Sequence, residues 1–285
     1  MIPAAFDYVR PASTTEALRL IASDEGARVL AGGQSLLPLL KLRLGSVERL
    51  IDIGRLDDLR GVRDAGAGTT EIGALTTYRE VLGAPLIRAR HPFLLDAIER
   101  IGDRQVRNRG TVGGAIAHGD PAADLPALLL ALDAQIELRS ATATRSVPAA
   151  AFFEAPFTTA ARHDELITTI RLPAPPSDGG GAYRLLEQPA SGYAIVGVAA
   201  VVAKSAGRVR HVRVGVTGAG EVAYRAMGVE GALHGSDGSA AAVAAAAAHA
   251  VEGIAVKSDF HADAAYRTAM ALVLARRALD AAIGR

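Results

Sequence analysis

The sequence predicts a protein of mixed helices and strands in two parts, and three observations carry this prediction. In some segments apolar residues recur at helical spacing, whereas in others they alternate or run together as in strands. Between them, residues 173–181 are almost entirely Pro, Gly and small residues. Such a stretch sustains neither a helix nor a central strand, so it marks a domain boundary. The first part is predicted to be α/β or α+β, and the second a small sheet backed by helices.

Helices and strands are predicted to alternate in the first part. Ser13-Thr14-Thr15-Glu16 forms a capping box that opens the first helix. Thr76 is the expected N-cap of the helix that follows the third strand. Strands are predicted at residues 28–31, 50–53 and 71–75, and helices at 36–44, 92–101 and 126–132.

The second part begins with strand patterns and ends with helices. Residues 194–204 are a nearly continuous apolar run, and apolar residues alternate over 209–216. Ser205-Ala206-Gly207 between them predicts a hairpin. Two alanine-rich or amphipathic segments, 240–250 and 262–283, are predicted helices.

Composition limits the classes of function. The chain has 285 residues, a net charge of +1 and no cysteine. The charge gives no bulk attraction to nucleic acid or to anionic lipid. Without cysteine the chain can hold neither a disulfide nor an iron–sulfur cluster of its own. Asp7 and Arg10 interrupt the start of the chain, and no apolar stretch reaches the ~20 residues that span a bilayer. We therefore expect a cytoplasmic protein with at most peripheral membrane contact.

Two glycine pairs are candidate binding loops. Ala31-Gly32-Gly33-Gln34-Ser35 lies between a predicted strand and a predicted helix, and Thr111-Val112-Gly113-Gly114 is similar. Neither contains the Gly-Lys-Ser/Thr of a P-loop. Taken together, they predict a diphosphate held by main-chain amides and hydroxyls, as in a dinucleotide. Asp124 either accepts hydrogen bonds from a ribose hydroxyl or is a plain acidic residue at a helix start.

Other candidate sites are weaker. Gly218-Ala219-Gly220 fits a loose dinucleotide pattern, but Gly228 interrupts the helix that should follow, so a flexible turn is expected. The seven histidines include no pair at metal-binding spacing, and no metal site is predicted. The sequence also lacks a Gly-x-Ser-x-Gly elbow. The arginines at 100, 104, 107 and 109 form either a solvated surface or a contact for phosphate or a partner.

Longer motifs resemble a known family. Residues 31–38, followed by Lys41-Leu42-Arg43, are similar to the first FAD loop of the molybdenum hydroxylase flavoproteins, and residues 101–114 and 118–126 to the second. The likeness continues at residues 165–167, 191–196 and 266–267, and so covers essentially the whole chain. It is strongest to the FAD-binding medium subunits of carbon monoxide dehydrogenase-type enzymes, which xanthine and heterocycle dehydrogenases also have.

The resemblance implies a fold and a set of cofactor-binding residues. The fold is the vanillyl-alcohol-oxidase-type FAD-binding domain at residues 1–175, with two α+β subdomains of about 1–57 and 58–175, followed by a C-terminal domain at 176–285. Asp124 would bind ribose, Ile101 would lie near adenine, and Ile167 and Tyr193 would approach the isoalloxazine. The alternative to a flavin contact is that Ile167 is simply a buried strand residue and Tyr193 an ordinary core residue. The diphosphate would be bound by Ala31, Gly32, Gly33, Gln34, Ser35, Thr111, Val112, Gly113 and Gly114.

The resemblance also implies a function. The chain would pass electrons from the [2Fe–2S] clusters of a small subunit through FAD to an external acceptor, while a molybdopterin-containing large subunit oxidises the substrate. The missing cysteines agree with this division of labour, and no side chain is nominated as catalytic. One departure is that residues 185–189 lack the Lys or Arg that relatives often carry there. The alternatives are a self-sufficient FAD-dependent oxidoreductase and a nucleotide-binding module without a redox role.

Overall fold

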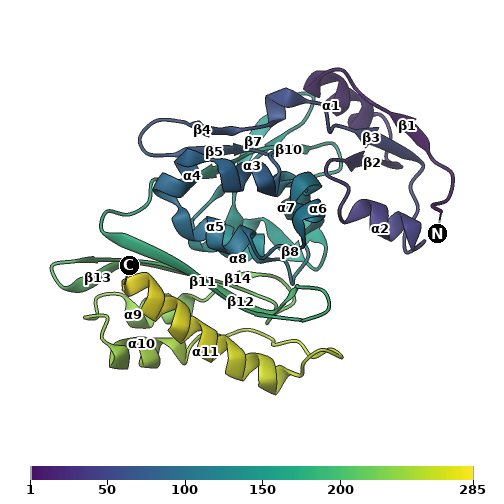
Figure 1. The fold of residues 1–285 in the computed structure, drawn as a ribbon. Coiled ribbons are helices and arrows are strands. Elements are labelled where there is room, and N and C mark those ends of the chain that lie inside the picture. The colour runs from purple at the N-terminus through teal and green to yellow at the C-terminus, as the bar shows by residue number, and fades with distance from the viewer. Residues whose placement is uncertain (1, 285) are drawn as a thin grey trace.

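The first region of the chain is a small parallel sheet with helices packed beside it (Figure 1). A computed structural model describes residues 2–284. The strands lie in the order β1-β3-β2, and α1 packs its apolar face against them through Ala17, Leu18 and Ile21. The elements are β1 (Asp7–Val9), α1 (Thr14–Ala22), β2 (Ala27–Leu30), α2 (Leu36–Lys41) and β3 (Arg49–Asp52).

The helix ends in this region follow from local chemistry. The Ser13 hydroxyl caps α1 by accepting from the amide of Glu16 at 3.2 Å. The Glu16 carboxylate accepts from the amide of Ala12 at 2.7 Å, one residue earlier than a capping box requires. The α2 helix is shorter than predicted because Arg43, just beyond its C-cap, has a φ of 57°. A left-handed residue at that point ends the helix.

The second region is a five-stranded antiparallel sheet in the order β4-β5-β10-β6-β7. One face carries an apolar core and is covered by helices, whereas the other carries ion pairs. Its strands are β4 (Val62–Asp64), β5 (Thr70–Gly73), β6 (Gln135–Arg139), β7 (Thr144–Pro148) and β10 (Leu166–Leu172), and a separate pair is β8 (Phe153–Ala155) and β9 (Thr158–Thr159). Its helices are η1 (Asp57–Leu59), α3 (Tyr78–Gly83), α4 (Pro85–Arg90), α5 (Pro92–Ile98), α6 (Arg104–Arg109), α7 (Val112–His118), α8 (Asp124–Ala131) and η2 (Ala149–Ala151).

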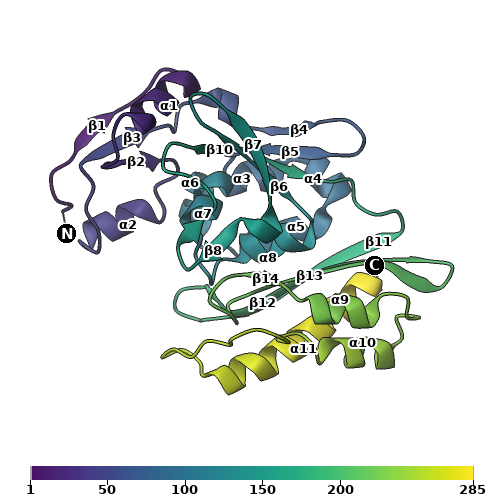
Figure 2. The same ribbon diagram turned by 180° about the vertical axis from the view of Figure 1, so that it is seen from behind.

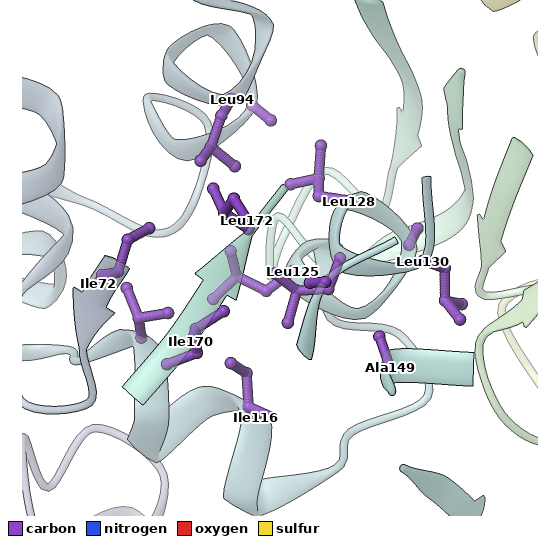
Figure 3. Close-up of a cluster of buried hydrophobic side chains, with 14 of the residues drawn as sticks. Ile72, Leu94, Ile116, Leu125, Leu128, Leu130, Ala149, Ile170 and Leu172 are labelled. Atoms are coloured by element: carbon purple, nitrogen blue, oxygen red, sulfur yellow. The ribbon is translucent and has the colours of Figure 1, made fainter. Parts of the chain in front are cut away.

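The two faces of this sheet follow from the alternation along β10. Ile170 pairs with Ile72 of β5 and Ile136 of β6, and all three are buried in the main core. Figure 3 shows Ile72 and Ile170 among leucines of the covering helices. The next residue, Arg171, points the other way and pairs with the carboxylates of Glu71 and Glu137, both at 2.8 Å. Strand residues alternate between faces, so one β-strand serves both surfaces.

Several predicted boundaries in this region are wrong by one to three residues; for example, β5 ends at Gly73 and not at residue 75, and α5 ends at Ile98 and not at residue 101. Thr77, and not Thr76, caps α3, and it exchanges hydrogen bonds with Glu80 in a complete capping box. Thr76 is buried, and its hydroxyl bonds to the backbone of Gly61 instead. The helix predicted from residue 126 begins at Asp124.

The third region is a four-stranded antiparallel sheet between two layers of helices, as Figure 2 shows. One face packs on α5 and α8, and the other on α9 and α11. The elements are β11 (Gly179–Glu187), β12 (Ala194–Ser205), β13 (Arg208–Thr217), β14 (Tyr224–Arg225), α9 (Met227–Leu233), α10 (Ala240–Ala247) and α11 (Ala264–Ile283).

The long apolar run of β12 reflects burial on both faces. Ala199 and Val201 belong to the core beneath α8, whereas Val198 and Ala200 belong to the core with α11. The predicted hairpin is confirmed: β12 and β13 are joined by a turn in which Ala206 and Gly207 have φ angles of 50° and 74°. Positive φ at both turn positions is typical of a tight hairpin between twisted strands.

The Pro/Gly stretch has two different parts. Residues 173–176 are outside helices and strands, as predicted. Gly179, Gly180 and Gly181 are instead the first residues of β11. They are tolerated there because β11 is an edge strand that pairs only with β12. Within residues 2–284, no helix combines the length and apolarity needed to cross a membrane.

Candidate functional site

The two glycine loops lie directly against each other. A Cβ atom on Gly32 would lie 2.1 Å from the carbonyl oxygen of Arg109 and 3.0 Å from the Cα of Gly110. A Cβ on Gly114 would lie 3.7 Å from the Cβ of Ala31. Only glycine permits so close a backbone approach at position 32. The structure therefore brings residues 31–35 and 110–114 into one place.

The first loop offers free main-chain donors. It links β2 to α2, and Gly33 has a φ of 75°. Among residues 2–284, the amides of Gly32, Gly33, Gln34 and Ser35 have no hydrogen-bond acceptor. The Ser35 hydroxyl makes no capping bond either. Adjacent free amides at a strand–helix junction are suited to an anion such as a diphosphate.

The second loop is built differently. The Thr111 hydroxyl caps α7 by accepting from the amide of Gly114 at 3.2 Å. The amides of Val112 and Gly113 donate to the carbonyls of residues 76 and 74, at 3.0 and 2.8 Å. Thr111, Val112 and Gly113 are buried, and Gly114 alone of these four is partly exposed. The two loops are therefore unequal: the first supplies donors and the second supplies a close-fitting wall.

Asp124 lies at the first position of α8, where its charge favours the helix start. Its side chain is only 6% exposed, and its Oδ1 accepts a hydrogen bond from the hydroxyl of Tyr183 on β11. Burial raises the pKa of Asp124 to about 6, and the Tyr183 hydroxyl acts in the opposite direction. The predicted helix-start position is confirmed, and the ribose contact stays a prediction.

The residues expected near the isoalloxazine differ in exposure. Tyr193 is 44% exposed, so the alternative of an ordinary core residue is wrong. Its loop is held to the second region by the amide of Ala194, which donates to the carbonyl of Ala122 at 3.1 Å. Burial, followed by the charges of Asp120 and Asp124, raises the pKa of Tyr193. Ile167 is a buried residue of β10, which agrees with the alternative prediction of a buried strand residue.

Ile101 and the arginine cluster lie beside the second loop. Ile101 is partly buried and precedes Gly102, whose φ is 54°. Arg107 Nη1 donates to the carbonyls of Ile101 and Gly102 at 3.1 and 2.7 Å. Within residues 2–284, none of the four arginines of the cluster forms an ion pair with a carboxylate within 4.0 Å. The cluster therefore leaves a positive rim near the loops.

Two residues of this site, Tyr183 and Lys257, were not predicted from the sequence. Tyr183 carries a polar hydroxyl into an apolar strand, which is a weak signal for a buried partner. Lys257 lines a cavity with Tyr193, and nothing in its local sequence points to this. The turn predicted at Gly218 is confirmed, because β13 leads there to β14 and not to a helix. No group of three or more potential metal ligands occurs in the described part of the chain.

Comparisons with known proteins agree over the whole length. Residues 4–175 match the FAD binding domain in molybdopterin dehydrogenase, and residues 181–282 match the CO dehydrogenase flavoprotein C-terminal domain. The chain is 41% identical to the carbon monoxide dehydrogenase medium chain of Hydrogenophaga pseudoflava, over 100% of this chain and 99% of the relative. It is 33% identical to the nicotine 6-hydroxylase medium subunit of Paenarthrobacter nicotinovorans, over 96% of both chains.

Solved structures give the same result. A chain of carbon monoxide dehydrogenase from Hydrogenophaga pseudoflava superposes with a TM-score of 0.96 at 42% identity, covering 100% of this chain and 99% of that one. A chain of quinoline 2-oxidoreductase from Pseudomonas putida 86 gives 0.93 at 31% identity, with the same coverage. The predicted resemblance and the α+β fold, an FAD-binding domain followed by a C-terminal domain, are confirmed. The chain therefore belongs to the family of FAD-binding medium subunits of the molybdenum hydroxylases, oxidoreductases in which this subunit is the flavoprotein.

Proposed function

We propose that this chain relays electrons from the [2Fe–2S] clusters of a small partner subunit, through its FAD, to an external acceptor. In this proposal a molybdopterin-containing large subunit carries out the substrate chemistry. The observation that carries the proposal is the first glycine loop, with four free amides packed beside a second loop across Gly32. The chain also has no cysteine, so any iron–sulfur cluster must belong to a partner.

The residues present fit FAD in their chemistry. The amides of residues 32–35 would hold the diphosphate, with Thr111, Val112, Gly113 and Gly114 as the opposite wall. Asp124 would accept from a ribose hydroxyl, and Ile101 would pack near the adenine. Ile167 and Tyr193 would contact the isoalloxazine. FAD supplies the redox chemistry when bound, and the chain's own task is to hold and orient it.

The division into parts belongs to the same proposal. The FAD-binding domain would extend over residues 1–175, with subdomains meeting near residue 57, and the C-terminal domain over 176–285. Relatives of this chain are named for different substrates, among them carbon monoxide, glyceraldehyde and nicotine. Similar medium subunits thus serve different reactions, which supports an electron relay that is independent of the substrate.

Copurification tests this function. The tagged chain, expressed together with its genomic neighbours, is expected to bring down a large subunit, a small cysteine-rich subunit and stoichiometric FAD. Adding the substrate of the complex should bleach the flavin only when both partners are present. A flavin that the isolated chain reduces with its own small substrate would overturn the relay in favour of a self-sufficient oxidoreductase. A complex without flavin would contradict any redox role.

A further inference from the structure

A cavity of about 300 Å³ lies beside Tyr193. Three separate segments line it, at residues 120–122, 188–195 and 257–267. We call it the Tyr193 cavity. It is smaller than most complete ligand pockets, so it suits one end of a ligand and not a whole dinucleotide. Its composition therefore indicates which end of a ligand it receives.

Two of the four charged residues at the cavity, Arg267 and Asp259, form an ion pair with each other. Arg267 is 2% exposed, and its Nη2 donates to both carboxylate oxygens of Asp259 at 2.6 Å. Its Nη1 donates to the carbonyls of Ile195 and Gly218 at 2.5 and 2.8 Å. Arg267 thus has a structural role and has no donors to spare for a ligand.

Lys257 is the cation of the cavity that has no such partner. It is half-buried, and its backbone amide is fixed by a bond to the carbonyl of Ala219 at 2.9 Å. Its ammonium forms neither a hydrogen bond nor an ion pair with any of residues 2–284. Burial and the charge of Arg267 lower the pKa of Lys257, whereas Asp259, Asp120 and Glu221 raise it. A cation that is half-buried without a partner is costly, which makes it a candidate for ligand recognition.

The other walls supply hydrogen-bonding groups of both kinds. The Gln188 Oε1 accepts from the amide of Ser191 at 2.6 Å, which leaves the Gln188 NH₂ free to donate. The Tyr193 hydroxyl is a further donor. Asp120 is the one acidic group without an arginine partner, and it lies beyond ion-pair distance from Lys257. The cavity thus suits a polar ring edge that carries carbonyl acceptors.

We propose that Lys257 places a positive charge against the carbonyl-bearing edge of the redox-active ring that Tyr193 contacts. This inference rests on the proposed function. The ring is either the pyrimidine end of the chain's own FAD or that of a quinone-type external acceptor, since both gain negative charge when they are reduced. Lys257 favours the more negative redox state by its charge. It is a positioning and tuning residue.

Redox titration of the purified complex tests the inference. Lys257→Met keeps the side-chain length and removes the charge, Lys257→Arg keeps the charge, and Lys257→Gln is a second neutral variant. If the ring is that of FAD, the neutral variants should bind reduced FAD about tenfold more weakly, relative to oxidised FAD, than the wild type does. For a two-electron couple this lowers the flavin midpoint potential by about 30 mV. Lys257→Arg should retain the wild-type potential.

The second arm measures acceptor kinetics with a water-soluble benzoquinone. If the ring belongs to the acceptor, the potential stays unchanged, and the KM for the benzoquinone rises about tenfold in the neutral variants. Lys204→Met is the matched control, because Lys204 donates to the carbonyl of Asp237 at 2.6 Å and does not line the cavity. Neutral variants with wild-type FAD content, potential and KM would overturn the role of Lys257. A wild-type complex without flavin would overturn the proposed function as well, so the two failures are distinguishable.

Discussion

The hydroxyl of Tyr183, on β11, donates a hydrogen bond to the carboxylate of Asp124, at the first turn of α8. These residues are 59 positions apart, and their bond joins the C-terminal sheet to α8, the helix after the one that begins at the second glycine loop. Both side chains are buried. The bond therefore couples the folding of the C-terminal sheet to the state of a carboxylate at the proposed cofactor site.

Replacing Tyr183 by Phe removes this bond and leaves a buried carboxylate without its donor. The free energy of unfolding should fall by about 1.5–3 kcal/mol at pH 7, because a hydrogen bond to a charged group is lost. The pKa of Asp124, already about 6 because of burial, should rise further. Urea unfolding measures the first effect, and carboxyl titration by NMR the second.

Tyr224→Phe is the matched control for that experiment. The Tyr224 hydroxyl donates to the neutral carbonyl of Ala250 at 2.9 Å, so its loss should cost only about 0.5–1.5 kcal/mol. Equal costs in both variants, with an unchanged pKa of Asp124, would contradict the account of the Tyr183–Asp124 bond.

His91 should make stability depend on pH in the opposite direction to Asp124. The side chain is 1% exposed, and its Nε2 has no hydrogen-bond partner in the described chain. Burial lowers the pKa of His91 to about 4. Between about pH 4 and 6.5 the unfolded state binds more protons at this position, so stability should fall as the pH falls, by up to about 1.4 kcal/mol per pH unit.

Asp124 has a raised pKa, so its contribution falls as the pH rises over about the same window. The contributions of His91 and Asp124 to the pH dependence of stability therefore partly cancel in the wild type. His91→Leu should remove one of them, and unfolding at a series of pH values should then show stability that declines from pH 4 towards pH 6. His234→Leu, at an exposed position, controls for the substitution itself. Identical pH profiles for wild type and His91→Leu would rule out this role.

Gly32→Ala should separate the two glycine loops. The added methyl would lie 2.1 Å from a backbone oxygen that cannot turn aside, so overpacking should cost about 1–3 kcal/mol of stability and lower the flavin content. Gly231→Ala is the control: it lies inside α9, and apart from the backbone of that helix and the adjacent residues no atom lies within 4 Å of the added Cβ. That variant should gain about 1 kcal/mol and keep its flavin.

Gly33→Val and Gly114→Val should each abolish flavin retention. Gly33 has a φ of 75°, which a β-branched residue adopts only with strain, and its amide belongs to the free donors of the first loop. A Cβ on Gly114 would lie 2.7 Å from the Thr111 hydroxyl that caps α7. Flavin absorbance relative to protein in the purified complex measures retention. Full occupancy in both variants would show that the diphosphate is bound elsewhere.

Glu230→Gln should be strongly destabilising. Glu230 is buried, accepts from the amide of Val214 at 2.9 Å and forms a two-point ion pair with Arg225. Arg225 keeps a second partner, Asp133, at 2.8 Å, so the loss should be about 3 kcal/mol, at the lower end for a broken buried pair. Asp280→Asn breaks the exposed pair with Arg276 and should cost below about 1 kcal/mol. Chemical denaturation measures the loss of unfolding free energy in both variants. Equal losses would contradict the prediction that the buried pair contributes more than the exposed one.

Local patterns in the sequence predict the secondary structure well where the determinants are themselves local. The hairpin at Ala206 and Gly207 and the apolar strand before it are examples. The error at Thr76 has a long-range cause, since its hydroxyl is engaged by the backbone of Gly61 and Thr77 takes the capping position. The sequence does carry a signal for Thr77, because Glu80 follows it at capping-box spacing, whereas Arg79 follows Thr76 at that spacing.

The candidate site was predicted only in outline for the same reason. Glycine pairs are visible in the sequence, but the amides of Val112 and Gly113 are consumed by carbonyls of residues 76 and 74, which no motif reveals. The Tyr183–Asp124 bond and the approach of Lys257 to Tyr193 likewise depend on which faces of the sheet and helices meet. The spacing of residues along the chain does not show which faces pack against each other.

The position of Arg267 on α11 has a consequence for biosynthesis. Its guanidinium holds the carbonyls of Ile195 and Gly218, so the wall around Tyr193 is fixed by a residue that leaves the ribosome long after both glycine pairs. A nascent chain that already displays both glycine pairs still lacks this support. Products truncated before α11 are therefore expected to emerge without a finished pocket, and insertion of the coenzyme is expected to follow synthesis of that helix.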